Sequence, residues 1–279
     1  MDPAVLREDM VNSVETQLDV SVAAPVSHAM RTVPREPFVE DAPYQNSSSE
    51  HIGTTILAPS VVARLLTALH ISTEPDINVQ MNSPESTENP ESADKSIAKG
   101  ESTHETASDD VLVVGAGVGY TAAVLAELID ERHVHAIDIN RRVVHTARSN
   151  LEVAGYEGVL VDTRDGAHGL PEYAPFNRIL VEAASLEPPK ALLNQLTANG
   201  RLVIPLGGPS QTIATVDAQG NILTEQGAVA LDPLLVEGES GDGPARNRTV
   251  REDAEFDESG YFAPTGWEQE WIDWDKNQQ

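Results

Sequence analysis

A glycine-rich turn between an apolar run and a helical pattern constrains the possible folds of this chain most. Residues 111–114 (VLVV) form the continuous apolar run that a strand buried on both faces requires. They lead directly into Gly115-Ala116-Gly117-Val118-Gly119, and apolar residues at helical spacing follow over 120–129. This order predicts a nucleotide-type site, because glycines let a ligand approach the backbone and the start of the helix presents amide groups to it.

Strand and helix patterns alternate after this turn. The sequence predicts strands at 133–139, 158–163, 177–182 and 201–206, and helices at 141–154 and 188–197. Such alternation is typical of βαβ units, so we expect an α/β, Rossmann-like fold with a mostly parallel sheet and helices on both faces. Residues 211–229 contain two strand patterns around a turn at 218–221, which predicts an antiparallel hairpin that closes the sheet.

Composition divides the rest of the 279 residues within what we expect to be a single domain, 1–279. Residues 1–72 are expected to form an N-terminal helical extension, including a helix at 59–71, and residues 110–236 the core. Residues 74–109 and 237–258 are rich in acidic and small side chains, which predicts two disordered or solvated insertions.

All three tryptophans, Trp267, Trp271 and Trp274, lie in the C-terminal stretch 259–279. Their spacings of four and three residues place them on one face of a helix. We therefore expect a C-terminal strand followed by a tryptophan-rich helix that packs on the domain. A helix that binds a partner through the same face is the alternative.

The charge balance excludes several classes of function. Asp and Glu number 45 against 18 Lys and Arg, a net charge of −27, so the chain repels phosphate backbones and we expect no nucleic-acid partner. Only four of the cations are lysines, which favours a halophilic protein whose acidic surface is screened by molar salt; an ordinary acidic protein is the alternative. The chain has no cysteine, which excludes disulfides, thiolate nucleophiles and zinc fingers.

Membrane and metal proteins are two further classes that the sequence disfavours. No apolar run approaches the roughly 18–20 residues of a membrane span, and the acidic N-terminus lacks the apolar region of a secretory signal. We therefore expect a cytoplasmic protein, with no membrane partner, and a monomer. His133, His135 and His145 lie near one another in the sequence, but without convergent Asp or Cys ligands we expect no metal site.

The details of the glycine turn and of the following strands distinguish between cofactors. Tyr120 stands where G-x-G-x-x-G has its third glycine, which counts against the pyrophosphate of NAD or FAD. Asp138 ends the second strand, 19 residues after Gly119, where a carboxylate can accept both ribose hydroxyls. Asp165 and Gly166 follow the third strand and suit an adenine amino group. With the closing hairpin, these positions favour S-adenosylmethionine; tight turns capped by aspartates are the alternative.

The ordered motifs resemble those of the protein-L-isoaspartate O-methyltransferase family. Residues 111–128 (VLVVGAGVGYTAAVLAEL) resemble its VLEIGTGSGYQAAVLAEL, and residues 33–39 (VPREPFV) resemble its VPRExFV. Residues 53–59 (GTTILAP) resemble its GQTISQP, and 164–184 and 200–207 match its later strands. The resemblance covers roughly 8–72, 110–236 and 259–275, and it implies a class I AdoMet-dependent methyltransferase.

The resemblance also implies a reaction. The family transfers a methyl group from S-adenosylmethionine to the side carboxylate of an L-isoaspartyl residue in a damaged protein, and repair then proceeds through a succinimide. Damaged, isoaspartyl-containing proteins or peptides would be the partners. A carboxylate is already the nucleophile at pH 7, so we expect no general base, and catalysis would come from alignment in a water-poor cleft.

Site residues follow from the same motifs. Thr54, Thr55 and Leu57 would contact the reacting groups. Gly115, Gly117, Gly119, Asp138, Asp165 and Gly166 would bind the cofactor, and the resemblance adds Ile56 and Thr265, the latter because 262–265 (FAPT) resembles the family's closing VPLT.

Four positions depart from the family motifs. Leu57 stands where the family has the serine beside the transferred methyl group, Thr54 and Ala58 replace its two glutamines, and Val113 replaces the acid two residues before the first glycine. Because Leu57 removes a polar group at the reaction centre, two alternatives stay open. One is a methyltransferase of the same fold that acts on another protein carboxylate, such as aspartate. The other is a non-catalytic adaptor that recognises damaged proteins.

Overall fold

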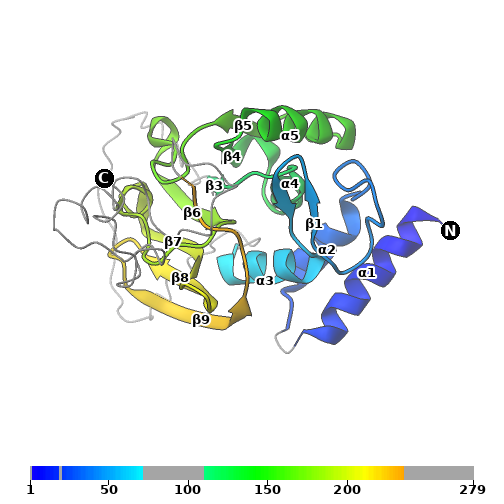
Figure 1. Cartoon of the computed structure of the whole chain (residues 1–279), viewed down its shortest axis with the longest axis horizontal. Coiled ribbons are helices and arrows are strands. Elements are labelled where there is room, and N and C mark those ends of the chain that lie inside the picture. The colour runs from blue at the N-terminus through cyan, green and yellow to red at the C-terminus, as the bar shows by residue number, and fades with distance from the viewer. Residues whose placement is uncertain (1, 19–20, 72–109, 236–279) are drawn as a thin grey trace, which may run out of the picture.

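A seven-stranded sheet forms the centre of the protein (Figure 1). The computed structural model describes residues 2–18, 21–71 and 110–235, so both expected insertions and the tryptophans lie outside the described residues. The strand order is β5-β4-β3-β6-β7-β8-β9. The strands are β3 (Val111–Val114), β4 (Val134–Asp138), β5 (Leu160–Thr163), β6 (Phe176–Val181), β7 (Leu196–Leu206), β8 (Gln211–Asp217) and β9 (Ile222–Val229).

The pairing confirms the expected α/β fold with a closing hairpin. The first five strands in this order pair in parallel, whereas β8 and β9 pair antiparallel at one edge. Since β3 lies between β4 and β6, the chain reverses its direction of travel across the sheet beside β3. Ligands of open α/β sheets bind outside the carboxyl ends of the strands at such a switch point.

Helices cover mainly one face of the sheet in the described part of the chain. That face packs against α3 (Pro59–Leu69), α4 (Tyr120–Leu128) and α5 (Arg141–Ala154), joined by α1 (Pro3–Gln17) and α2 (Ala24–Thr32). The other face carries only the 3-10 turn η2 (Pro171–Tyr173) and the single turn α6 (Lys190–Leu193) among the described residues. A second 3-10 turn, η1 (Glu131–His133), precedes β4. None of these helices is long and apolar enough to span a bilayer.

The helix predicted at 188–197 is wrong over its second half. It ends after Leu193, and the chain is extended from Leu196 because Leu196 pairs with Phe176 of β6. The pairing register then shifts, and Arg178 pairs with Arg201. Thr197 and Gly200 are poor helix formers, so sheet pairing satisfies this backbone better than a longer helix would.

A short hairpin that the sequence did not predict precedes α3. It comprises β1 (Ser49–His51) and β2 (Thr54–Ile56), in which His51 pairs with Thr54. The two turn residues, Ile52 and Gly53, have φ angles of 46° and 78°. Positive φ at both turn residues is the pattern of a type I′ turn, which matches the twist of paired strands. Thr54 and Thr55 lie on β2, the second strand of this hairpin.

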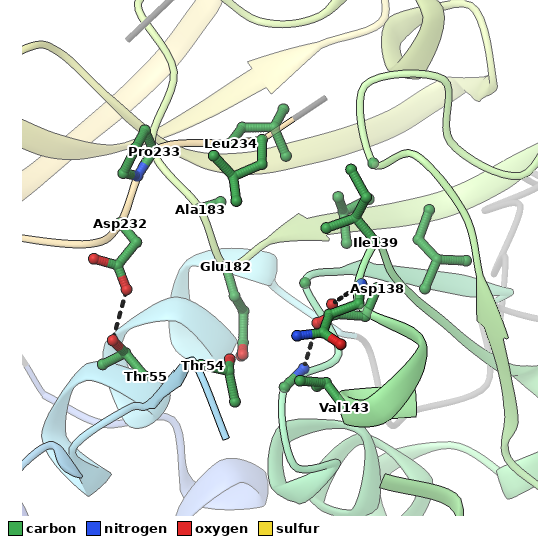
Figure 2. A pocket seen from close by; sticks show the side chains of 18 of the residues that line it. Thr54, Thr55, Asp138, Ile139, Val143, Glu182, Ala183, Asp232, Pro233 and Leu234 are labelled. Atoms are coloured by element: carbon green, nitrogen blue, oxygen red, sulfur yellow. Dashed lines mark hydrogen bonds between the residues drawn. The ribbon is translucent and has the colours of Figure 1, made fainter. Parts of the chain in front are cut away.

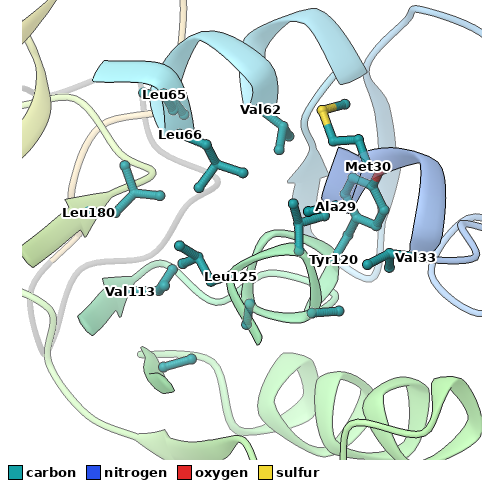
Figure 3. Packing of buried hydrophobic residues seen from close by; sticks show 14 of the residues in the cluster. Ala29, Met30, Val33, Val62, Leu65, Leu66, Val113, Tyr120, Leu125 and Leu180 are labelled. Atoms are coloured by element: carbon teal, nitrogen blue, oxygen red, sulfur yellow. The ribbon is translucent and has the colours of Figure 1, made fainter. Parts of the chain in front are cut away.

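The N-terminal helices share one hydrophobic core with the sheet (Figure 3). Met30 of α2 and Leu66 of α3 are at most 1% exposed and belong to the same cluster as Val113 of β3 and Tyr120 of α4. Burying a side chain of this size contributes roughly 1.5–3 kcal/mol. The N-terminal extension is therefore an integral layer, and it fixes the β1–β2 hairpin relative to the glycine turn.

Candidate functional site

A cavity of about 350 Å³ lies at the carboxyl ends of β3, β4 and β6. Its walls are the glycine turn, the β1–β2 hairpin and the segment 231–235, which follows β9 (Figure 2). Small-molecule sites have volumes of roughly 300–1,000 Å³, so the cavity is large enough for a ligand. It lies at the switch point beside β3, where the strand order predicts a ligand.

The glycine turn contributes Gly115 and Gly117 to the cavity wall, but not Gly119. Gly119 has φ of 96°, and a Cβ there would lie 3.2 Å from Cγ of Leu151 and 3.3 Å from the carbonyl oxygen of Ala147. Both of these residues belong to α5. The glycine at 119 therefore allows α4 to pack closely on α5, while the first two glycines face the cavity.

Asp138 ends β4 and faces the cavity beside the glycine turn. Its Oδ2 accepts a hydrogen bond from the amide of Gly117 at 3.1 Å, and its Oδ1 accepts one from the amide of Asn140 at 2.9 Å. Burial raises the pKa of the Asp138 carboxyl, and the two amides oppose this shift. A carboxylate has about four lone-pair sites, so both oxygens can still accept hydrogen bonds from ligand hydroxyls.

Asp165 and Gly166 occupy different positions relative to the cavity. Asp165 caps its own turn: Oδ1 accepts from the amide of Ala167 at 2.9 Å, and Oδ2 lies 3.3 Å from Nδ1 of His168. Gly166 lines the cavity, and a Cβ there would lie 2.6 Å from Cγ1 of Val114. Of this pair, only Gly166 forms part of the cavity wall.

The β1–β2 hairpin and the residues after it bring Thr54, Thr55 and Leu57 to the cavity. The hydroxyl of Thr55 donates a hydrogen bond of 2.6 Å to Oδ2 of Asp232 (Figure 2). Ile56 is 6% exposed and faces a smaller adjoining cavity.

Arg35 holds this segment from inside the protein. Its side chain is 1% exposed, and Nη2 donates a hydrogen bond of 2.8 Å to the carbonyl oxygen of Leu57. The guanidinium carbon lies 4.4 Å from the ring centroid of Tyr120, in a cation–π contact. Burial lowers the pKa of Arg35, and Tyr120 opposes this shift. Arg35 therefore fixes the backbone beside the cavity.

The segment 231–235 forms a cavity wall that the sequence did not predict. The amide of Ala184 donates to the carbonyl oxygen of Asp232, and the amide of Leu234 donates to that of Ala184, both at 2.8 Å. A Pro-Leu pair at 233–234 was a usable signal, because the family's closing VPLT contains the same pair. The motif resemblance matched VPLT to residues 262–265 instead, and Thr265 lies outside the described residues.

Glu182, directly after β6, is a second cavity residue that the sequence did not predict. Burial raises the pKa of its carboxyl to about 7; the Thr121 hydroxyl opposes this shift and the Asp138 carboxylate adds to it. The sequence did contain a signal for this residue, because an acid that directly follows a buried parallel strand lies at the edge of the sheet where ligands bind.

The histidines considered as metal ligands do not line the cavity. Nδ1 of His133 lies 2.8 Å from Oδ1 of Asp110, and His135 packs between Tyr173 and Phe176. His145 is exposed on α5. No group of three or more potential metal ligands occurs within 2–18, 21–71 and 110–235.

The sheet order and the cavity above the glycine turn define a class I methyltransferase fold. A Plasmodium falciparum structure, assigned as a protein-L-isoaspartate O-methyltransferase in complex with S-adenosyl-L-homocysteine, has the same fold. It superposes with a TM-score of 0.60 at 18% identity, over 82% of this chain and 97% of that one.

Sequence comparisons then identify the family. The model of the protein-L-isoaspartate(D-aspartate) O-methyltransferase family matches residues 102–231. A protein-L-isoaspartate O-methyltransferase from Methanocella arvoryzae is 35% identical over 74% of this chain and 96% of its own length. One from Aeropyrum pernix is 37% identical over 68% of this chain. The chain belongs to the protein-L-isoaspartate(D-aspartate) O-methyltransferase family, as the motifs indicated. It spans 63% of the Aeropyrum relative's length, and 64% and 58% of two further relatives.

Proposed function

We propose that the chain is an AdoMet-dependent protein carboxyl methyltransferase that acts on the side carboxylate of L-isoaspartyl residues. The observation that carries this proposal is the cavity, which combines the Asp138 carboxylate, the glycine turn and the 54–57 segment in a chain of this family. Similarity to family members at 34–48% identity supports the reaction.

The cavity wall fits the proposed cofactor. S-adenosylmethionine, when bound, supplies a methyl group made electrophilic by its sulfonium. Asp138 is positioned to accept hydrogen bonds from the two ribose hydroxyls, while Gly115 and Gly117 leave the backbone open to close approach. Gly166 keeps its part of the wall free of a side chain, because a Cβ there would contact Val114. Gly119, Asp165, Ile56 and Thr265 remain proposed cofactor residues.

The substrate side of the cavity is the 54–57 segment. An isoaspartyl carboxylate is ionised at pH 7 and needs no base, so the protein's contribution is to orient it and to exclude water. Thr54 and Thr55 present hydroxyls to this space, and Leu57 presents an apolar side chain. The methyl ester that forms loses methanol when the next backbone amide nitrogen attacks it, and hydrolysis of the resulting succinimide partly restores aspartate.

The working environment is part of the proposal. We propose a monomeric, single-domain protein of a salt-rich cytoplasm, with neither nucleic acid nor membrane as partner. The chain has 45 acidic residues against 18 basic ones, and only four of the basic residues are lysines, which supports a salt-rich environment without nucleic-acid partners.

Leu57 supports one alternative reaction. An apolar side chain at the reaction centre is compatible with a different protein carboxylate, such as aspartate, as the substrate. A non-catalytic adaptor that recognises damaged proteins would keep the same cavity.

A methyl-transfer assay separates the three functions. The full chain is incubated in molar KCl with methyl-labelled AdoMet and an isoaspartyl peptide or its aspartyl twin, and released methanol is counted. We expect methanol from the isoaspartyl peptide alone, and none from an Asp138→Ala variant. Equal transfer to the aspartyl twin would favour the alternative carboxylate. Peptide binding and AdoMet binding without transfer would favour the adaptor.

A further inference from the structure

Glu182 places a carboxyl group at the inner end of the cavity. Its side chain extends from the end of β6 toward Thr54 of the hairpin (Figure 2). It lines both the main cavity and the smaller one under the hairpin. Its Oε1 is buried and has no hydrogen-bond partner. A buried polar atom without a partner costs free energy, so its presence in a cavity needs an explanation.

The charges around the cavity indicate what Glu182 would bind. Among the described residues that line the cavity, Asp138, Glu182 and Asp232 are acidic and none is Lys or Arg. Asp138 faces the glycine turn and Asp232 is hydrogen-bonded to Thr55, so each already has a partner. In the view of Figure 2, Glu182 is drawn between them. A ligand group that binds Oε1 must therefore donate a hydrogen bond, and a cationic donor forms the strongest one.

The position of Glu182 corresponds to a departure from the family motif. The resemblance gives the family an acid where this chain has Val113. Val113 of β3 pairs with Leu180 of β6, and both belong to the same hydrophobic cluster on one face of the sheet. Because side chains alternate along a strand, Glu182 points to the same face as Leu180. The carboxyl group absent at 113 is thus present just beyond the end of the neighbouring strand, on the same face and two residues after Leu180, the partner of Val113.

We propose that Glu182 binds the α-ammonium group of the methyl donor, at the end of the sheet where the family motif has an acid and this chain has Val113. This inference rests on the proposed function, because it requires AdoMet in the cavity. The ammonium group is favoured over the sulfonium for a chemical reason. A carboxylate beside the sulfonium would stabilise the positive charge of the reactant, which disperses in the transition state, and would therefore slow methyl transfer.

Binding calorimetry on the full chain in molar KCl tests this assignment with Glu182→Gln. Three probes are compared: AdoMet, S-adenosylhomocysteine, which keeps the ammonium but has no sulfonium, and 5′-methylthioadenosine, which has neither. Hydrogen bonds to charged groups contribute about 1.5–3 kcal/mol, so we expect the first two affinities to fall about 10- to 100-fold. The affinity for 5′-methylthioadenosine should not change, which also shows that the variant is folded. Glu157→Gln, the same change at an exposed residue outside the cavity, should leave all three unchanged.

Proton release gives a second readout. An ammonium ligand favours ionised Glu182, so the wild-type chain should release protons on binding AdoMet near pH 6.5, as measured in buffers of different ionisation enthalpy. Glu182→Gln should release fewer. The other titratable groups that face this space are Asp138 and Asp232 in the main cavity and the Tyr120 phenol in the smaller one, all of which both proteins keep. The hydroxyls of Thr54, Thr55 and Thr121 face it as neutral groups.

Specific outcomes would overturn the inference. A loss confined to AdoMet would assign Glu182 to the sulfonium, and a loss shared by 5′-methylthioadenosine would indicate general damage to the cavity. Equal affinities in wild type and Glu182→Gln would overturn the role of Glu182 while leaving the proposed function intact. If the wild-type chain binds none of the three probes, the proposed function fails, and this inference with it.

Discussion

Replacing Glu182 by glutamine should stabilise the cofactor-free protein at neutral pH. Burial raises the pKa of Glu182 from 4.5 to about 7, so the folded state holds the proton more tightly than the unfolded state does. Below pH 4.5 the protonated carboxyl therefore makes its full contribution to the free energy of unfolding. The folded protein loses this contribution as the pH rises from 4.5 through 7. Glutamine has the same shape and no ionisation, so the Glu182→Gln variant avoids the loss.

The pKa difference sets the magnitude. Each pKa unit corresponds to ~1.36 kcal/mol, so the ionised carboxyl costs about 3 kcal/mol of unfolding free energy above pH 7. For a domain of about 150–250 residues, this corresponds to a melting temperature roughly 6–12 °C higher in the variant.

Urea denaturation of the full chain at constant salt, from pH 4.5 to pH 8, measures this effect. The difference between Glu182→Gln and wild type should be close to zero at pH 4.5 and should grow through pH 7. Glu157→Gln, at an exposed position, should track the wild type throughout. A difference that stays constant or shrinks with rising pH would refute the reasoning. A variant that gains stability while losing AdoMet affinity would also exclude unfolding as the cause of the lost binding.

Four other substitutions probe separate parts of the cavity. Asp138→Ala should abolish calorimetric AdoMet binding without unfolding the chain, since it removes the proposed ribose acceptor. Gly117→Val should also abolish binding by filling ligand space, at a cost in unfolding free energy because Gly117 has a φ of 50°. Unchanged affinity in either variant would reject the assigned cavity. Gly166→Ala should lower the unfolding free energy, measured by urea denaturation, by about 1–3 kcal/mol, because its Cβ would lie 2.6 Å from a Val114 methyl. A variant as stable as the wild type would show that Val114 can move aside without cost. Asp232→Asn keeps an acceptor for Thr55 but removes a charge, so KM for acidic isoaspartyl peptides should fall while AdoMet affinity stays constant; a parallel change in both would contradict a role confined to the substrate side.

Local patterns were sufficient to predict the elements that carry the cavity. The glycine turn, the strand that ends at Asp138 and the closing hairpin all follow from periodicity and turn chemistry, and the structure contains each of them. The same patterns brought Gly115, Gly117 and Gly166 to one space, because the carboxyl ends of parallel strands meet at one edge.

Features that depend on distant contacts were not predictable in the same way. The β1–β2 turn places Ile52, a β-branched residue, at a φ of 46°, a conformation that its own sequence disfavours. The segment 231–235 becomes a cavity wall only because its backbone pairs with Ala184. The lack of a hydrogen-bond partner at Oε1 of Glu182 likewise depends on what the hairpin and the glycine turn place around it. Residues 81–106, whose deletion we expect to leave folding nearly intact, and the tryptophan segment after Glu258 stay predictions, since they lie outside the described residues.

Arg35 fixes the backbone at position 57 whatever side chain stands there. Its guanidinium holds the carbonyl oxygen of Leu57, a group that every residue type possesses. A substitution at 57 therefore alters what faces the cavity without displacing the backbone that presents it. The family's serine and the leucine of this chain can occupy the same place on an unchanged scaffold. A change of side chain at position 57 can thus alter the substrate side of the cavity while the fold around it is preserved.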